Sequence, residues 1–389
     1  MAKQTHDVIV VGGGVMGCAT LYYLTQMGVT DALLIEREAL ASGSTGRSAA
    51  ILRSHYSNEV TTLMSVYGRE VISNFEDVLG EPGGFVKTGY FFMVSEERVE
   101  GLRKNVALGQ RVSLDTEEIS PAEALDLMPD GFDLDGIATV AYEPESGYAD
   151  SSAVTTGFAN AARRAGATMS IGSSVTELLV EGEKIVGVAT PDERIYAERV
   201  VLCGGPWTND LLTTVGAQLP LEFVRHQVIV LRRPLDRLPV LPTVGDESGG
   251  YSFRPDSSDI TLVTIKEEPT DRETYNRSVD AEVAATVMEV MTKRHSAFAD
   301  AGWDGGWSGI FTVTPDWHPV IDAVPAVDGL FVGAGFSGHG FKMSPAIGRA
   351  LAELAVDGSS HSIDAKPLRY RRFAEGDLVR SSYGASVFA

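Results

Sequence analysis

The sequence predicts an α/β protein of two domains: a Rossmann-like domain with a mostly parallel sheet, and a second domain with a mixed or antiparallel sheet. The chain has 389 residues, and chains beyond roughly 250 to 300 residues usually divide into more than one hydrophobic core. Three apolar runs end in glycine turns at widely separated positions. Between them, stretches rich in Pro, Thr, Val and Tyr alternate as antiparallel strands do, for example at residues 260–265.

The first elements form a βαβ unit. An apolar, β-rich run at residues 7–11 leads into the glycine turn 12–17, and a helical pattern continues to Met27. A second apolar run, residues 32–35, ends at Glu36. Strand, glycine turn, helix and parallel strand in this order are typical of a dinucleotide-binding domain.

The middle and the end of the chain repeat the strand-to-glycine design. A helix that ends near Gly166 precedes strand-like pieces at residues 168–171, 175–180 and 185–189. The second glycine turn closes the run 200–205, and a helix is expected from Trp207 onward. The third closes the run 330–335, and a helix is expected to open near Ser344 and to reach Val356.

The three turns are far apart in sequence, and we expect them to converge in space. The dinucleotide-binding domain is then discontinuous and comprises residues 1–85, 148–215 and 314–389. Residues 86–147 and 216–313 form the second domain, which is expected to bind the substrate. We find no internal repeat and no low-complexity tract.

The charge balance excludes one class of partner. The chain carries 53 acidic and 32 basic side chains, a formal net charge of -21. Such a charge repels phosphate backbones, so nucleic acid is not an expected partner. The densest basic stretch, Arg369, Arg371 and Arg372, is expected to lie on a solvated helix face.

The cysteine count and the N-terminus point to a cytoplasmic protein. Cys18 and Cys203 are too few for a disulfide framework, and no CxxC spacing suggests a metal site. Asp7 leads straight into the first strand, without the pattern of a secretory signal. The low-charge segment 8–28 is interrupted by glycines and polar residues, so no membrane span is expected.

The glycine turn at the N-terminus carries the chemistry of dinucleotide binding. Its pattern is Gly12-x-Gly14-x-x-Gly17, and Glu36 follows nineteen residues later at the end of the next strand. The glycines allow a tight turn and a close approach of the backbone to a pyrophosphate. The carboxylate of Glu36 is expected to accept hydrogen bonds from a ribose.

A polar loop soon after Glu36 favours a flavin over a nicotinamide cofactor. Residues 42–50 (Ser-Gly-Ser-Thr-Gly-Arg-Ser-Ala-Ala) supply small side chains, hydroxyls and one guanidinium. Such a loop suits a path along a pyrophosphate and an isoalloxazine edge. A nicotinamide enzyme has no obvious use for it.

Together with the late stretch 333–345 (GAGFSGHGFKMSP), these motifs resemble the D-amino-acid-oxidase-like superfamily of FAD-dependent oxidoreductases. Within it they are most similar to the branch of sarcosine oxidase and the sarcosine oxidase β-subunit, and the resemblance covers nearly the whole chain. It implies FAD as cofactor. The residues that the motifs and the resemblance assign to cofactor binding are Gly12, Gly14, Val15, Met16, Gly17, Glu36, Arg37, Ser44, Thr45, Arg47, Ser48, Ala49, Val175, Cys203, Gly204, Gly205, Trp207, Gly335, Gly338, His339, Gly340, Phe341 and Lys342.

The resemblance also implies a substrate site. In monomeric sarcosine oxidases an arginine after the flavin loop and a lysine that closes the late glycine motif hold the substrate carboxylate, and Arg53 and Lys342 match these positions. Structural ion pairs are the alternative for both. His55 and Tyr251 are expected to line the substrate pocket, with packing in the core as an equal alternative for Tyr251. His339 is expected either to contact the flavin or to be a packed, hydrogen-bonded ring.

Two departures from the resembled family bear on the cofactor and on the electron acceptor. Gly309 stands close to the position where covalent members carry a cysteine, so FAD is expected to bind non-covalently. The lysine that activates oxygen in monomeric sarcosine oxidases falls near Val263, and Lys266 is a poor substitute because a shift of three residues along a strand faces the other side. We expect oxygen or another compound as the electron acceptor.

The function expected from the resemblance is FAD-dependent oxidation of a small secondary or N-methylated amino acid, sarcosine-like or cyclic. Hydride transfer to flavin N5 gives an imine that water hydrolyses. Oxidation of a D-amino acid or a 2-hydroxy acid is an alternative. A further alternative is that the chain is the flavin-bearing subunit of a hetero-oligomeric amine oxidase, and both a homo-oligomer and a hetero-oligomer are compatible with the sequence.

Overall fold

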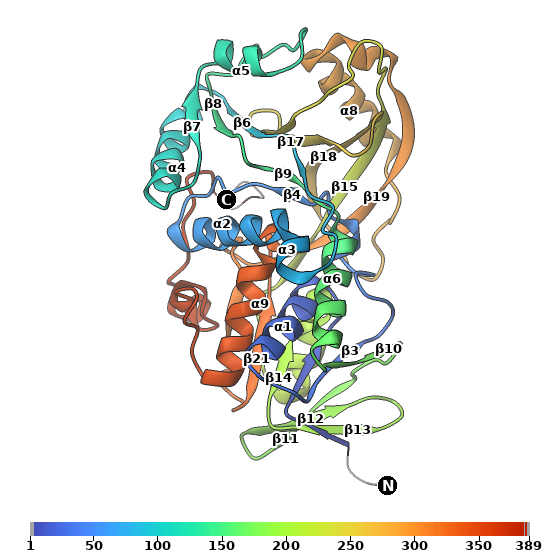
Figure 1. Ribbon diagram of the computed structural model, residues 1–389, viewed down its shortest axis with the longest axis vertical. Helices are drawn as coiled ribbons and strands as arrows, with labels where there is room; N and C mark the ends of the chain where they lie inside the picture. Colours follow the sequence, from blue (N-terminus) through green and yellow to red (C-terminus); the bar gives the residue numbers. More distant parts are fainter. Residues whose placement is uncertain (1–3, 385, 387–389) are drawn as a thin grey trace.

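The computed structural model describes residues 4–384 and 386, without the side chains of Lys266 and Glu267. Figure 1 shows an elongated molecule with the N-terminus at one end. A sheet flanked by helices occupies the lower half, and a second, larger sheet occupies the upper half. The helices α2 (Glu59–Ser73) and α3 (Phe75–Leu79) lie between the two halves.

The sheet of the lower half is mostly parallel and confirms the predicted fold class. Its six strands run in the order β10 (Thr168–Ile171), β3 (Ala32–Glu36), β2 (Val8–Val11), β14 (Val200–Leu202), β21 (Leu330–Ala334) and β20 (Val320–Ala323). Every neighbouring pair is parallel except β20 with β21. The sheet therefore collects strands from the beginning, the middle and the end of the chain.

Alternating side chains bury both faces of this sheet. Val8, Val10 and Leu34 pack in one core with the helices α1 (Val15–Gln26), α6 (Ser151–Arg164) and α9 (Gly340–Asp357). Ile9 and Leu33 face the opposite core. That core is completed by α7 (Thr208–Leu212) and by a four-stranded sheet in the order β1 (Gln4–His6), β13 (Arg194–Ala197), β12 (Lys184–Ala189) and β11 (Glu177–Glu181). Strands buried on both faces are continuous apolar runs, which explains their sequence.

The sheet of the upper half is mixed, as predicted. Its order is β19 (Gly302–Val313), β15 (Glu222–Arg232), β18 (Ile260–Pro269), β17 (Tyr251–Pro255), β16 (Thr243–Asp246), β6 (Tyr90–Val94), β8 (Thr139–Glu143) and β7 (Glu117–Ile119). Only the pair β16 and β6 is parallel among these described strands. The remaining upper helices are α4 (Val99–Arg111), α5 (Pro121–Leu127) and α8 (Ala281–Arg294).

Short elements connect the two halves. A three-stranded sheet joins β4 (Ile51–Leu52), β9 (Gly147–Tyr148) and β5 (Val86–Lys87), close to the predicted domain boundaries. Every strand of the upper sheet falls within residues 86–147 and 216–313. The division of the whole chain into two domains stays a prediction.

Short 3-10 helices occur in both halves. They are η1 (Thr45–Arg47), η2 (Glu96–Arg98), η3 (Gly205–Trp207), η4 (Thr213–Val215), η5 (Ser296–Asp300) and η6 (Lys366–Leu368).

One helix begins earlier than predicted. The helix α9 opens at Gly340 rather than near Ser344 and contains Pro345 in its second turn. A proline lacks only its own backbone N–H, whose partner here would be the carbonyl of Phe341. So near the N-terminus the helix loses one hydrogen bond and continues. Pro345 marked the start in the sequence because proline is frequent at the first helical position.

The C-terminal basic stretch was also predicted wrongly. Arg372, at the start of α10 (Arg372–Glu375), has a side-chain exposure of 0% and pairs with Asp316 at 2.8 Å. Asp316 also accepts hydrogen bonds from the backbone of His318 and Val379. The three arginines therefore do not form one solvated helix face. The buried ion pair of Arg372 with Asp316 joins the C-terminal helix α10 to the loop before β20.

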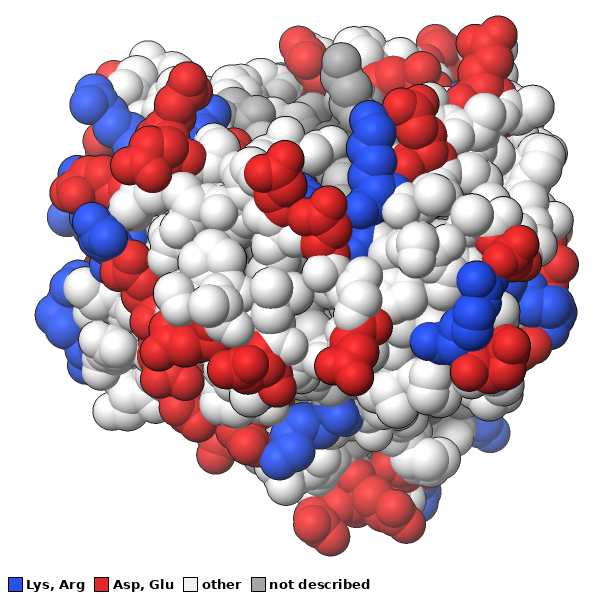
Figure 2. Space-filling model, turned by 90° about the horizontal axis from the view of Figure 1, so that it is seen from above, with Lys and Arg blue, Asp and Glu red and all other residues white. Residues whose placement is uncertain are grey.

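Charges on the surface are mixed. On the face that Figure 2 shows, acidic side chains lie beside most of the basic ones. Ion pairs such as Arg232 with Asp259 and Asp304 account for part of this mixing. None of the helices in the described part of the chain has both the length and the apolarity that a bilayer span requires.

Candidate active site

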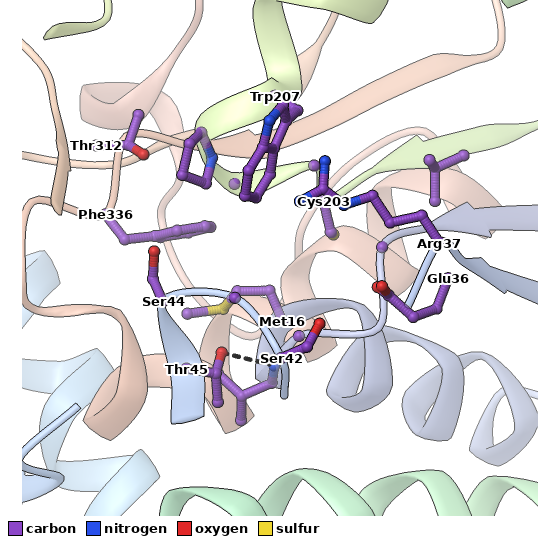
Figure 3. Close-up of a pocket in the computed structure, with 18 of the residues that line it drawn as sticks. Met16, Glu36, Arg37, Ser42, Ser44, Thr45, Cys203, Trp207, Thr312 and Phe336 are labelled. Carbon is purple, nitrogen blue, oxygen red and sulfur yellow. Dashed lines mark hydrogen bonds between the residues drawn. The ribbon is translucent and has the colours of Figure 1, made fainter. Parts of the chain in front are cut away.

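A cavity of about 410 Å³ lies where the strands β2, β3 and β14 of the parallel sheet end. Its wall is formed by the N-terminal glycine turn, Glu36, the polar loop after it, the glycines that follow β14, and the late glycine stretch. The three predicted turns therefore converge on one cavity. Figure 3 shows Met16, Glu36, Thr45, Trp207 and Phe336 around it. Ligands of open α/β sheets bind in this position, outside the carboxyl ends of the strands.

The backbone of the glycine turn is packed too closely for side chains, and Gly12 and Gly14 line the cavity. A Cβ on Gly12, whose φ is +109°, would overlap the carbonyl oxygen of Cys203, and a Cβ on Gly17 would overlap the carbonyl oxygen of Gly12. The N-terminus of α1 faces the cavity with Gly14 and Val15. Backbone N–H groups and the positive end of the helix dipole favour an anion there.

Glu36 is held in place by two backbone N–H groups, and its contact with a ribose stays a prediction. Its side chain is buried, and its two oxygens accept hydrogen bonds from the backbone N–H of Gly13 at 2.6 Å and of Glu38 at 2.8 Å. Each carboxylate oxygen keeps further acceptor capacity for a sugar hydroxyl. Beside it, the guanidinium of Arg37 stacks on Trp207, 3.5 Å from the ring centroid. Both side chains line the cavity and form a flat wall there (Figure 3).

The polar loop is fixed by its own hydrogen bonds. Thr45 Oγ1 accepts from the backbone N–H of Val15 at 3.2 Å, the bond drawn in Figure 3. Ser44 Oγ donates to the carbonyl of Ile310 at 2.8 Å. Arg47 donates to the carbonyls of Ser42 and Gly43, and it does not line the cavity. Its contact with the cofactor stays a prediction, whereas its role in shaping the loop is visible.

Most of the residues assigned to the cofactor come together in this cavity. Those that line it are Gly12, Gly14, Val15, Met16, Glu36, Arg37, Ser44, Thr45, Ser48, Val175, Cys203, Gly204, Gly205, Trp207, Gly338, Gly340 and Phe341. Gly17, in the first turn of α1, and Gly335, whose φ is +67°, do not line the cavity, and Ala49 and Lys342 line a neighbouring cavity. Burial raises the pKa of the Cys203 thiol to about 12, so it is an unreactive part of the wall.

His339 lies beneath the two cavities rather than in their walls. It is buried, and its Nδ1 is 3.2 Å from the hydroxyl of Tyr56. Within the described part of the chain, its buried Nε2 has no hydrogen-bond partner. Burial, and then the charges of Arg53 and Lys342, lower its pKa well below the usual value, so the ring is neutral. A direct contact with the flavin stays a prediction.

A second, smaller cavity of about 70 Å³ adjoins the first. The two share Ser48, Phe311, Gly338 and Phe341 in their walls. Arg53 and Lys342 both line the small cavity, although they come from opposite ends of the sequence. The two residues therefore meet in a cavity beside the larger one, and their contact with a substrate carboxylate, which the resemblance implies, stays a prediction.

Both cations are buried. Arg53 is 5% exposed, donates to the carbonyl of His55 at 2.7 Å and lies over the ring of Tyr56. Burial alone would lower its pKa, but nearby Tyr56, Tyr90 and Glu143 outweigh it and raise the pKa. Lys342 is 6% exposed. Its pKa is held well below the usual lysine value by burial and then by the charge of Arg53.

Glu143 is the acid that accompanies the two cations. It is fully buried and accepts hydrogen bonds from the backbone N–H of Ser54 at 2.9 Å and from Ser146 Oγ at 2.6 Å. Burial raises its pKa, although these hydrogen bonds and the charges of Arg69 and Arg53 act in the opposite direction. Its interaction with Lys342 favours the ammonium form of the lysine.

The two tentative pocket residues differ in position. Tyr251 lines the small cavity, but its hydroxyl accepts a hydrogen bond from Arg294 Nε at 3.0 Å. His55 does not line it: its Nε2 is 2.8 Å from the hydroxyl of Tyr383. Burial, and then the charge of Arg53, lower the pKa of His55 to about 3. His55 is therefore a neutral ring behind Arg53.

Several lining residues were not anticipated from the sequence. Tyr90, His226, Ser252 and Thr264 all line the small cavity. Ser252 and Thr264 are partners in the register of the strands β17 and β18. The sequence offered one signal for them, since both are polar residues within otherwise apolar strands. The neighbouring Val263 is fully buried in the upper core. The side chain of Lys266 lies outside the described part of the structure.

Gly309 and His318 lie outside the walls of both cavities. A Cβ on Gly309 would lie 3.0 Å from Cβ of Arg47, so the position faces the polar loop. His318 receives a hydrogen bond from Asn58 at its Nε2, 2.8 Å away, and its Nδ1 lies 2.6 Å from the carbonyl of Asp316. These two partners identify His318 as a packed, hydrogen-bonded ring. In the described residues, no cluster of His, Cys, Asp and Glu could hold a metal ion.

Comparisons with known proteins agree with this geometry. The human mitochondrial sarcosine dehydrogenase is 27% identical over 91% of this chain, and this chain spans only 40% of its length. The sarcosine oxidase subunit beta of Rhodobacter capsulatus is 27% identical, with 99% of this chain and 92% of that protein aligned. The crystal structure of L-proline dehydrogenase from P. horikoshii superimposes with a TM-score of 0.89 at 26% identity, over 97% of this chain and 100% of that one.

A family model described as FAD dependent oxidoreductase (DAO) matches residues 7–354, most of the chain. The match contains the glycine turn, Glu36, both cations and the late glycine stretch. The cavity and its donors fit the cofactor of that family. The chain belongs to the DAO family of FAD-dependent oxidoreductases.

Proposed function

We propose that the protein oxidises a small secondary or N-methylated amino acid, sarcosine-like or cyclic, at the bond between carbon and amine nitrogen. The observation that carries this proposal is the pair of buried cations, Arg53 and Lys342, in a cavity that shares walls with the cofactor cavity. When bound, FAD supplies the acceptor for the hydride that leaves the carbon next to the nitrogen. The imine product is released to water and hydrolyses.

The chain contributes binding and orientation. Arg53 and Lys342 would hold the carboxylate by charge-assisted hydrogen bonds, and the fork of the guanidinium suits two carboxylate oxygens. Arg53 keeps its positive charge in this buried site, because Tyr56, Tyr90 and Glu143 raise its pKa. Burial and Arg53 lower the pKa of Lys342, and Glu143 acts in the opposite direction, as a bound substrate carboxylate would.

The small cavity also limits the size of the substrate. Tyr90, Ile51, Ile265 and Phe341 line it, and its volume is about 70 Å³. Apolar and aromatic walls exclude water and suit the methyl group or ring carbons of a secondary amine. The named relatives act on sarcosine and L-proline according to their names, which supports a substrate of this size.

The same scaffold supports oxidation of a D-amino acid or a 2-hydroxy acid, because the two cations bind the carboxylate that these compounds share. A second proposal follows from the extent of the likeness to a sarcosine oxidase subunit beta, which spans both chains almost completely. The chain would then be the flavin-bearing subunit of a hetero-oligomer. A preparation of this chain alone that turns over a substrate without added protein would contradict that proposal.

The experiment is anaerobic mixing of the holoenzyme with a panel of N-methyl, cyclic, D- and 2-hydroxy acids, followed by oxygen. Flavin bleaching identifies the substrate class, and recovery of the oxidised spectrum shows whether oxygen accepts the electrons. Arg53→Ala and Lys342→Ala are each expected to weaken the apparent substrate affinity about 10- to 100-fold, the effect of one charge-assisted contact. Lys104→Ala, an exposed lysine on α4, is the control. Unchanged affinity in both site variants would contradict the proposal.

A further inference from the structure

The C-terminal segment 379–383 runs from the cofactor half of the molecule to the hydrophobic cluster behind the small cavity. Val379 donates its backbone N–H to Asp316 at 3.1 Å. Ser382 donates its backbone N–H to Ser57 Oγ at 3.0 Å, just before α2. The side chain of Ser382 also donates to Asn105 Oδ1 on α4 at 3.3 Å. The segment is therefore anchored at both ends rather than trailing into solvent.

Tyr383 is the side chain that this segment inserts. It is 4% exposed and packs with Tyr90, Phe92 and Leu102. Its ring centroid is 5.2 Å from that of Phe92 and 5.8 Å from that of His55. Its hydroxyl lies 2.8 Å from His55 Nε2. A residue near the end of the chain thus contributes to the core behind the small cavity.

The partners of His55 determine its tautomer. The amide nitrogen of Asn105 is 3.4 Å from the same Nε2, and an amide nitrogen can only donate. Asn105 is oriented by its other bonds, a donation to Ser57 Oγ at 3.1 Å and an acceptance from Ser382 Oγ at 3.3 Å. Nε2 of His55 is therefore an acceptor, its proton is on Nδ1, and the hydroxyl of Tyr383 donates.

His55 connects this bond to the substrate site. Its backbone carbonyl accepts the hydrogen bond from Arg53 Nη1 at 2.7 Å, and Arg53 lines the small cavity. The path from Tyr383 to the guanidinium consists of two hydrogen bonds through one residue. A shift of His55 that includes its backbone would move this carbonyl, an acceptor that helps to orient Arg53.

We propose that Tyr383 is a positioning residue for Arg53: the C-terminal segment fixes His55, and His55 fixes the guanidinium that receives the substrate carboxylate. This inference rests on the proposed role of Arg53. It assigns a part in substrate binding to a segment that lies outside the matched family region, residues 7–354. No chemical step passes through Tyr383.

The test uses acetate, a carboxylate without an amine, titrated into the holoenzyme while the flavin absorbance is followed. Tyr383→Phe removes only the hydroxyl and is expected to weaken acetate binding about 3- to 10-fold, the range of one neutral hydrogen bond. FAD affinity should not change. Tyr370→Phe is the matched control, because it removes a C-terminal tyrosine hydroxyl that donates to the carbonyl of Gln218, away from Arg53. Its acetate affinity should equal that of the unmodified protein.

A double-mutant cycle with Arg53→Ala separates the possible outcomes. If Tyr383 acts through Arg53, the variant Tyr383→Phe has no further effect when Arg53 is already alanine. An equal effect in both backgrounds, or no effect of Tyr383→Phe alone, overturns the inference. If Arg53→Ala itself leaves acetate binding unchanged, the proposed function fails as well. Should Tyr383→Phe not fold, Ser57→Ala, which removes an anchor of the segment, carries the same expectations.

Discussion

The carbonyl oxygen of Lys342 packs directly against Gly68, so closely that a Cβ on this glycine would overlap it. Gly68 lies on α2 and Lys342 on α9, and the two helices meet at this point. The backbone of the proposed carboxylate-binding lysine is therefore located by a glycine on another helix. A larger residue would force α2 and the start of α9 apart.

The first prediction concerns this contact. Gly68→Ala should destabilise the protein by about 1 to 3 kcal/mol, the usual cost of overpacking, despite the better helix propensity of alanine. It should also weaken acetate binding, because Lys342 is displaced. Gly302→Ala is the control, since its Cβ would meet only Cβ of Arg232 at 3.8 Å. Thermal unfolding and acetate titration measure both effects, and a variant equal to the control in both would contradict the account.

The second prediction concerns cofactor affinity. Glu36→Ala removes the ribose acceptor and leaves the backbone N–H of Gly13 without its partner. FAD affinity should fall about 10- to 100-fold, the effect of a hydrogen bond to a charged group. Glu38→Ala, an exposed carboxylate next to it, should bind FAD normally. Titration of the apoprotein with FAD, followed by fluorescence of Trp207 in the cavity wall, measures the affinity.

The third prediction concerns the buried pair of Asp316 and Arg372. Burial alone would raise the pKa of Asp316, but hydrogen bonds from Arg372, Val379 and His318 lower it below the ordinary value of 3.8. A carboxyl whose pKa is lower in the folded state stabilises the fold above its unfolded pKa. This stability is lost as the pH falls through the folded pKa.

Asp316→Asn should therefore cost about 3 to 5 kcal/mol at neutral pH, because it leaves the guanidinium of Arg372 buried and unpaired. The difference between variant and parent should shrink in acid, below pH 3.8. Arg369→Met is the control. It removes the more exposed ion pairs of Arg369 with Glu375 and Asp377, and it should change the free energy of unfolding only slightly. Chemical denaturation at several pH values checks both statements. A constant difference across the acid range would show that Asp316 is not the titrating group.

The fourth prediction concerns the pH dependence of carboxylate binding. The pKa of Lys342 lies well below that of an ordinary lysine because of burial and the charge of Arg53. As the pH rises through this lowered pKa, the ammonium loses its charge and acetate should bind more weakly. Acetate carries no amine, so the change reports on the protein. Lys342→Met should bind acetate weakly and without this pH dependence; the same dependence in the variant would assign it to another group.

The sequence predicted the cofactor half well for a physical reason. Strand, glycine turn and helix are local patterns, and Glu36 follows directly at the end of the next strand. The substrate wall could not be predicted in the same way. Tyr90, Ser252 and Thr264 lie on three strands of one sheet, and only the register of these strands brings them together.

Three other residues show the limits of local reasoning. Arg47 donates to two carbonyls of its own loop, which the sequence did not predict, and its contact with the flavin stays a prediction. Arg372 was expected in solvent, and a distant Asp316 buries it. His55 was expected in the substrate pocket, but Tyr383 holds it behind Arg53. In each case the position of the side chain depends on a hydrogen-bond or ion-pair partner that the local sequence does not reveal. This partner is either remote in sequence or a backbone carbonyl.

The most direct test of the central claim is anaerobic titration of the holoenzyme with sarcosine and L-proline, in parallel for the unmodified protein, Arg53→Ala and Lys342→Ala. The account predicts that at least one of these amino acids bleaches the flavin, and that each variant needs about 10 to 100 times more of it for half-bleaching. A flavin that neither these nor any other amino acid reduces would contradict the proposed function. If both variants are half-bleached at the same substrate concentration as the unmodified protein, the proposed roles of Arg53 and Lys342 are contradicted.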